Sequence, residues 1–445
     1  MWTTLAAASL SLAALAAGLP QAAERDDLET RIRAIAREAS TEGGLEGLTV
    51  AIAIGSDTLV AEGTGASSGP EKPYRVGALT EPFTALAILQ LAERGKLDPD
   101  DPVSKHLPEL DWEETVTVHH LLAHTSGVPS TAVLAPGSLG APPEQRARVL
   151  EELRGHGLDF SPGTCFTYSD ADYLLLGFLV EKLSGEALPA YLAAEVFAPL
   201  GMDATAYTEN GPKRFAGAPS VQEVGGDSIL LEHAERPFRA DELCSTAGDL
   251  LRWVRGLADR TLLEGAAYRR MFTAGRLADG TRIPYGCGFS TTELERVPGV
   301  SCGGAIEGYQ VRVAFYPDAE LAIALLACCE ERGLGRLEQR LARLVLDIDE
   351  PGILDLPLSA EERAPYVGLY QIGCSHLRVV DANERLAVQT TNRPEWTLLF
   401  QGEHRFVVDG DPDVRLTFEV EDEGNRARSF VLDERGVQSM AVRID

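Results

Sequence analysis

The stretch YRVGALTEPFTALAILQLAERGKL, residues 74–97, begins as a short extended run and continues as an amphipathic helical pattern. Four residues, Ala78-Leu79-Thr80-Glu81, form the join between the two patterns. Ala78 offers no nucleophile, and Glu81 lies one helical turn further on. Other segments of the chain are needed to indicate what role these four residues have and whether they support catalysis.

Strand-like runs lie on both sides of a long helical middle region. This order predicts an α/β (α+β) fold, in which one antiparallel sheet is closed by the two ends of the domain and flanked by helices, with an additional all-helical region. The strand-like runs are residues 48–55, 58–63, 285–291, 299–304, 310–317 and 321–328, and helical patterns cover 25–41, much of 81–272 and 334–347.

A second unit follows this domain, which we place at residues 24–348. Residues 349–365, DEPGILDLPLSAEERAP, read as a linker. Beyond them, about eight short strand-like runs alternate with turn residues, a spacing typical of a small antiparallel barrel. The sequence therefore predicts a small C-terminal β-barrel domain at residues 366–445.

Charge and the N-terminal composition limit where this chain works. Its 445 residues carry a net charge of −28 and no cluster of lysine or arginine, which argues against nucleic acid as a partner. Residues 1–23 are uncharged, apolar and rich in small side chains, which predicts a cleaved signal peptide and a periplasmic or secreted protein with no membrane span in the mature chain. An unexported N-terminal segment is the alternative.

Five ordered segments together resemble one family of hydrolases. The chain is similar, over roughly residues 30–345, to the serine β-lactamase-like family, which contains class C β-lactamases, D,D-peptidases and related esterases. The tail, with YVGLY at 366–370, resembles the small barrel often appended to these hydrolases. The segments are residues 74–110, VTVHHLLAHTSGVP at 116–129, FSPGTCFTYSDADYLLLGFLVEKLSG at 160–185, STAGDLLRWVRGL at 245–257 and VSCGGAIEGYQVRVAFYPD at 300–318.

The resemblance implies three catalytic motifs, and all three are altered. Where the family has Ser-x-x-Lys, whose Ser attacks a carbonyl and whose Lys assists, this chain has Ala78 and Glu81. Where the family has Tyr-x-Asn, Tyr168 is kept and Asp170 replaces the amide. Where the family has Lys or His followed by x-Gly on an edge strand, Cys302 stands in the cationic position and Gly304 is kept.

These changes predict a groove that binds without catalysing. The N–H groups of Ala78 and Ala305 correspond to the family's oxyanion hole and could still bind a carbonyl. Glu81 and Asp170 add negative charge, so we expect neutral or cationic ligands to be preferred to anionic ones. The alternative is that both carboxylates have no specific role in ligand binding and are solvated at the mouth of the groove.

Cys302 admits three interpretations. It is a replacement nucleophile beside Tyr168, or a disulfide partner of Cys287, or a buried small side chain. A hairpin turning near residues 294–295 would set Cys287 opposite Cys302. We favour the buried side chain, because Glu81 and Asp170 would disfavour a thiolate.

His120 and His124 are spaced i, i+4, which can bind zinc on a helix. The general-base Glu of the zinc motif and a third ligand are missing, and the segment fits the family's structural turn. We therefore expect neither a metal nor any other cofactor.

Our prediction is an exported, non-catalytic relative of these hydrolases whose groove binds a small molecule or peptide. The alternatives are an active esterase, amidase or peptidase with a non-standard nucleophile such as Cys302 or Thr80, and a purely structural role. The sequence leaves the oligomeric state open.

Overall fold

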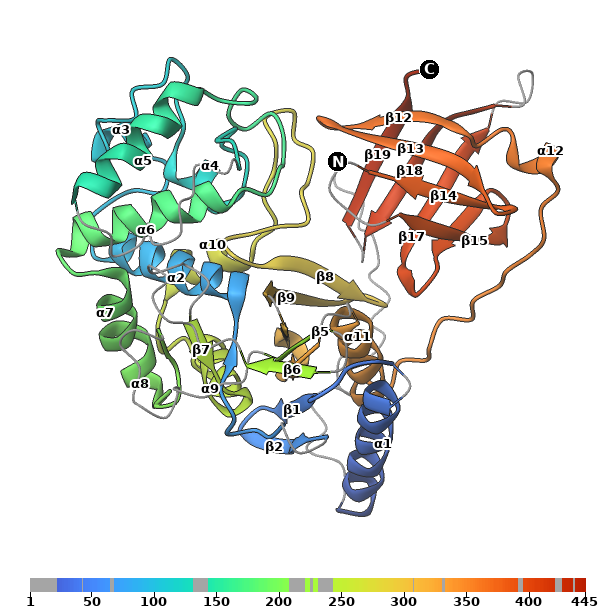
Figure 1. Cartoon of the computed structure of the whole chain (residues 1–445), viewed down its shortest axis with the longest axis horizontal. Coiled ribbons are helices and arrows are strands. Elements are labelled where there is room, and N and C mark those ends of the chain that lie inside the picture. Colours follow the sequence, from blue (N-terminus) through green and yellow to red (C-terminus); the bar gives the residue numbers. More distant parts are fainter. Residues whose placement is uncertain are drawn as a thin grey trace, which may run out of the picture.

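The computed structural model describes two connected bodies, a mixed helix-and-sheet domain and a barrel (Figure 1). Of the predicted signal peptide, residues 1–21 lie outside the described residues. Among the helices of the described ranges, none has the length and apolarity needed to cross a membrane. The described residues are 22–41, 43–64, 68–130, 143–207, 221–224, 227–230, 243–306, 308–329, 333–390, 395–420, 426–434 and 437–445.

The central sheet is antiparallel and has the order β2-β1-β11-β10-β9-β8. Its first two strands come from the beginning of the domain, and β1 pairs with the last strand, β11, since Val50 lies opposite Leu325. The predicted closure of one sheet by both ends of the domain is therefore confirmed. The strands are β1 (Thr49–Ile54), β2 (Asp57–Gly63), β8 (Ser290–Leu294), β9 (Val297–Ile306), β10 (Tyr309–Tyr316) and β11 (Leu321–Ala327).

Helices cover both faces of this sheet. Helices α1 (Ala22–Thr41) and α11 (Leu334–Val345) pack together on one face, whereas α2 (Thr80–Glu93) and α9 (Ala247–Ala258) lie on the other (Figure 1). The expected amphipathic pattern of α2 is wrong, because every residue from Thr80 to Leu91 is buried. A helix covered on all sides is apolar around its whole circumference, and α2 is therefore a core helix that positions Glu81 inside the domain.

The all-helical region lies beside α2. Its largest member, α6 (Asp170–Ser184), packs on α2 and ends at Gly185, whose φ of 80° is the left-handed cap that its glycine predicts. The remaining elements are α3 (Val103–His106), α4 (Val118–Leu122), α5 (Pro143–His156), α7 (Leu188–Leu192), α8 (Ala198–Leu200), α10 (Gly265–Phe272), β3 (Tyr74–Arg75), β4 (Ala206–Tyr207), β5 (Val221–Val224), β6 (Asp227–Leu230) and β7 (Leu243–Ser245).

The C-terminal body is a closed eight-stranded antiparallel barrel, as predicted. Aromatic rings, including Tyr370, Phe406 and Phe418, fill its interior. The segment before it contains one short helix, α12 (Ala360–Arg363). The barrel strands are β12 (Gly368–Ile372), β13 (Ser375–Ala382), β14 (Arg385–Gln389), β15 (Trp396–Gly402), β16 (Arg405–Val408), β17 (Asp411–Val420), β18 (Ala427–Glu434) and β19 (Val437–Arg443).

A disulfide and a buried ion pair are among the links that fasten the barrel to the first domain. A disulfide joins Cys165, in the loop before α6, to Cys374, in the exposed turn between β12 and β13. Arg343 of α11 donates to Asp413 of β17 at 2.5 Å, and both side chains are buried. The barrel is therefore held both at the loop that carries Tyr168 and at α11.

Candidate functional site

The join between the strand and the helix is a tight turn that supports the groove. Residues Gly77–Leu79 form a single helical turn ahead of α2, and Gly77 has a φ of +51°. Strand β9 lies directly against this turn at Gly304, where a Cβ would be 2.1 Å from the carbonyl oxygen of Val76 and 2.8 Å from the nitrogen of Ala78. Only glycine permits this approach, so Gly304 keeps β9 and the start of α2 together.

Glu81 lies one turn beyond Ala78 and is only 7% exposed. Its Oε1 accepts a hydrogen bond from the Tyr168 hydroxyl at 2.6 Å, and its Oε2 accepts one from the Tyr285 hydroxyl at 2.9 Å. Two phenols therefore fix the carboxylate where the family has its lysine. Glu81 is not a solvated carboxylate at the mouth of the groove.

Tyr168 brings Glu81 and Asp170 together, a relationship that the sequence left open. Its ring is 43% exposed, whereas its hydroxyl lies 2.6 Å from Glu81 and 3.0 Å from Oδ1 of Asp170. One hydroxyl hydrogen thus serves two carboxylates. Burial, together with these two charges, raises the pKa of Tyr168 far above its ordinary value, so the side chain is a phenol at neutral pH.

His124 is the functional residue that the sequence analysis missed. Its side chain is completely buried, with Nδ1 2.9 Å from Oδ2 of Asp172 and Nε2 3.7 Å from Oε2 of Glu81. Burial alone would lower the pKa of His124, but the two carboxylates outweigh it and raise the pKa to about 9. Burial raises the pKa of Asp172 to about 6, so this carboxyl is still mainly ionised at neutral pH.

His120 makes different hydrogen bonds from those of His124. Its backbone N–H donates to Thr117 Oγ1, and its ring Nδ1 accepts from the Thr117 N–H, which caps the start of α4. The two rings of the i, i+4 pair therefore belong to separate hydrogen-bond systems. The sequence did hold a hint of these contacts. His124 lies in a motif of the family that the chain resembles, and an imidazole is well suited to pair with a carboxylate.

Cys302 lines the groove but is only 7% exposed. Burial, reinforced by Glu81, raises the pKa of this thiol well above its ordinary value even though Arg312 acts in the opposite direction. The thiol is therefore protonated at neutral pH, as expected for a small buried side chain.

The proposed pairing of Cys287 with Cys302 is wrong. The β8–β9 hairpin turns at Glu295 and Arg296, so Ser290 lies opposite Ser301, and this register does not bring position 287 opposite position 302. Residues 286–289 also leave the ladder in a turn closed by a bond from the Gly286 N–H to the Phe289 carbonyl. Both thiols are free, and Cys287 instead approaches the carbonyl of Arg270 at 3.6 Å.

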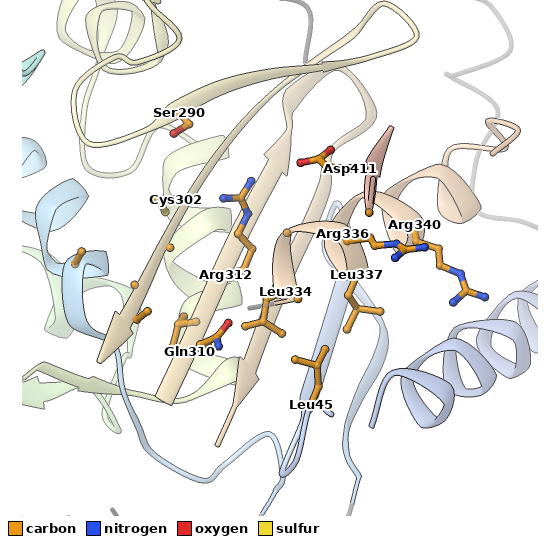
Figure 2. Close-up of a pocket in the computed structure, with 18 of the residues that line it drawn as sticks. Leu45, Ser290, Cys302, Gln310, Arg312, Leu334, Arg336, Leu337, Arg340 and Asp411 are labelled. Carbon is orange, nitrogen blue, oxygen red and sulfur yellow. The ribbon is translucent and has the colours of Figure 1, made fainter. Parts of the chain in front are cut away.

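A cavity of about 1160 Å³ runs from these residues to the barrel. Six of the predicted site residues line it: Ala78, Glu81, Tyr168, Cys302, Gly304 and Ala305. Asp170 is connected to it through Tyr168. Its lining also includes Gly303 of β9, residues 333–337 of α11 and the turn before it, and residues 408–411 of the barrel, and Figure 2 shows part of it.

Comparison with known proteins agrees with this architecture. Residues 32–347 match the model of the Beta-lactamase family. Penicillin-binding protein 4* of Bacillus subtilis is 27% identical over 448 residues, covering 89% of this chain and 94% of that protein.

Solved structures show the same fold. An octameric penicillin-binding protein homologue from Pyrococcus abyssi has a TM-score of 0.62 at 23% identity, with 93% of this chain and 99% of that chain covered. A D-amino acid amidase from Ochrobactrum anthropi, complexed with D-phenylalanine, has a TM-score of 0.60 at 20% identity, with 72% of this chain and 99% of that chain covered. The chain therefore belongs to the Beta-lactamase family.

Proposed function

We propose that this chain is an exported, non-catalytic member of its family that uses the old groove to bind a small molecule or a peptide. The observation that carries the proposal is the pair Ala78 and Glu81. A methyl group stands where the attacking hydroxyl belongs, and the carboxylate one turn on is fixed by Tyr168 and Tyr285. Neither side chain forms the acyl-enzyme on which the family reaction depends.

The other candidate nucleophiles are unfavourable. Cys302 carries a protonated thiol, and Thr80 is buried and does not line the cavity. The groove itself remains, because Gly304 still allows β9 to lie against the turn at Ala78. A preserved cavity without an activated nucleophile supports binding rather than turnover.

The electrostatic surroundings of Glu81 favour neutral or cationic ligands. Glu81 and Asp172 flank the ring of His124, and Asp170 joins Glu81 through the Tyr168 hydroxyl, so three carboxyl groups gather around one histidine. A ligand carboxylate placed over Ala78 would be repelled by them. Export is supported by the Cys165–Cys374 disulfide, since such bonds persist in oxidising compartments.

The test is hydrolysis of p-nitrophenyl butyrate by the purified protein, by Cys302→Ala and by the double variant Ala78→Ser/Glu81→Lys. We expect a silent wild type and measurable turnover in the double variant, because the scaffold around the motif is intact. Wild-type turnover that disappears in Cys302→Ala would contradict the proposal and make Cys302 the nucleophile of an active hydrolase. Equal turnover in the wild type and in Cys302→Ala would also contradict it and would direct attention to Thr80 or Glu81.

A further inference from the structure

One arm of the cavity, between α11 and the barrel, lies on the other face of the sheet from Glu81. Arg312 pairs with Gly303 across the β9–β10 ladder, and Cys302 pairs with Val313. Because neighbouring side chains on a strand point to opposite faces, Arg312 and Cys302 lie on different sides of the sheet. Figure 2 shows the Arg312 side chain leaving β10 on the side of α11 and Asp411.

The guanidinium of Arg312 is only partly used by the protein. Its Nη2 donates to Ser301 Oγ at 2.6 Å and lies 3.5 Å from Glu338 Oε2. Its Nε is buried without a hydrogen-bond partner, and no described residue accepts from Nη1. The buried Nε is closed to a ligand and Nη2 is already used by the protein, so Nη1 is the donor that remains for a ligand.

The charges around Arg312 favour a ligand with a single negative charge. Arg336 stands exposed at the rim, with Nη1 close to Gly410 of the barrel turn. Arg340 is already bound by both oxygens of Glu38, each at 2.9 Å. Glu38, Asp409 and Asp411 line the cavity, and Glu338 contacts Arg312 from α11. These four acids make a dianion costly, so a ligand on Arg312 carries at most one negative charge.

Apolar side chains also line this arm. Leu45, Leu334 and Leu337 form one side of it (Figure 2), and Trp396 of the barrel also lines it. We propose that this arm binds an organic acid, with its carboxylate on Nη1 of Arg312 and its hydrocarbon part against these side chains. The site goes beyond the proposed groove function and depends on neither Ala78 nor Glu81.

The experiment titrates the oxidised, full-length protein with hexanoate, using calorimetry. Hexylamine and hexan-1-ol carry the same hydrocarbon tail without the anion, and inorganic phosphate carries the charge without the tail. We expect hexanoate to bind saturably and more tightly than the other three probes. Equal binding of hexan-1-ol or hexylamine, or tighter binding of phosphate, would overturn the proposal without the use of any variant.

Two matched arginine variants locate the site. Arg312→Lys keeps a positive charge opposite Glu338 but removes the fork, so we expect hexanoate affinity to fall about tenfold or more. Arg340→Lys changes an arginine of the same cavity that Glu38 already occupies, and it should leave the affinity within about twofold of the wild-type value. Unchanged affinity in a folded Arg312→Lys variant would refute the assignment.

Discussion

Nε2 of His124 lies 3.7 Å from Oε2 of Glu81, so the residue that replaces the family's lysine is the direct electrostatic neighbour of a buried histidine. A lysine at position 81 would oppose an imidazolium at this distance, whereas a glutamate favours it. In this chain the positive charge beside position 81 is therefore on His124. This pairing explains how a buried carboxylate is accommodated on α2.

Replacing Glu81 with Gln should lower the pKa of His124. The variant keeps the shape of the side chain but removes one of the two charges that raise the pKa to about 9. We expect the titration midpoint of the imidazole to fall by about one pH unit or more. The measurement is an NMR titration of the histidine ring signals, with His156, an exposed histidine of α5, as the internal control. An unmoved His124 midpoint would mean that Asp172 alone sets its pKa.

The contact between His124 and Glu81 also predicts how the free energy of unfolding depends on pH. The pKa of His124 is about 9 in the folded chain against 6.5 for an unperturbed histidine, so the folded state holds the proton more tightly. The resulting stabilisation is complete below about pH 6.5 and is lost as the pH rises through about 9, with a size on the order of 3 kcal/mol. Urea unfolding at pH 6 and pH 9.5 measures this difference, which should be smaller in Glu81→Gln. A wild-type free energy of unfolding that rises over this interval would contradict the assignment.

The disulfide between Cys165 and Cys374 closes a long segment, since 209 positions separate the two residues. Replacing Cys374 with Ser should therefore lower the free energy of unfolding by about 2–5 kcal/mol, because the unfolded chain regains freedom. Denaturant titration of the wild type and the variant measures the effect. Cys244→Ser, at a buried cysteine that forms no disulfide, is the control for loss of a cysteine as such. If reducing agent destabilised the wild type and Cys374→Ser equally, the bond would contribute nothing.

Gly304→Ala should be among the most damaging single substitutions in the chain. The added Cβ would lie 2.1 Å from the Val76 carbonyl oxygen and 2.8 Å from the Ala78 nitrogen, and both atoms belong to the backbone. We expect a loss of about 3 kcal/mol or more, or failure to accumulate folded protein. Gly155→Ala in α5 is the matched control, because nothing lies within 4 Å of its new Cβ, and this variant should be neutral or slightly stabilising. Thermal unfolding of the two variants decides between these outcomes.

The sequence predicted the fold well because the fold depends on patterns that repeat along the chain. Strand-like runs at 48–55 and 321–328 pair as expected, and the turn-rich tail closes into a barrel. The amphipathic pattern assigned to α2 was wrong, since its polar residues, such as Glu81, are buried by tertiary contacts that no local pattern reveals. The motif comparison found most of the groove, because Glu81, Tyr168 and Cys302 all line the cavity.

What the sequence could not supply was long-range geometry. Cys165 and Cys374 are far apart in the chain, and a count of cysteines does not identify which of them pair. A two-residue turn at Glu295 and Arg296 moved the β8–β9 register away from the expected alignment of Cys287 with Cys302. His124 was considered only as a metal ligand, since its contacts with Glu81 and Asp172 come from separate helices.

The Cys165–Cys374 bond can form only after most of the chain has been synthesised. Cys165 lies three residues before Tyr168 and is buried, yet its partner leaves the ribosome only after 209 further positions have been added. The loop that carries Tyr168 therefore gains its covalent tie only after the first barrel strand has been synthesised. Until then Cys165 has no disulfide partner in the newly made chain.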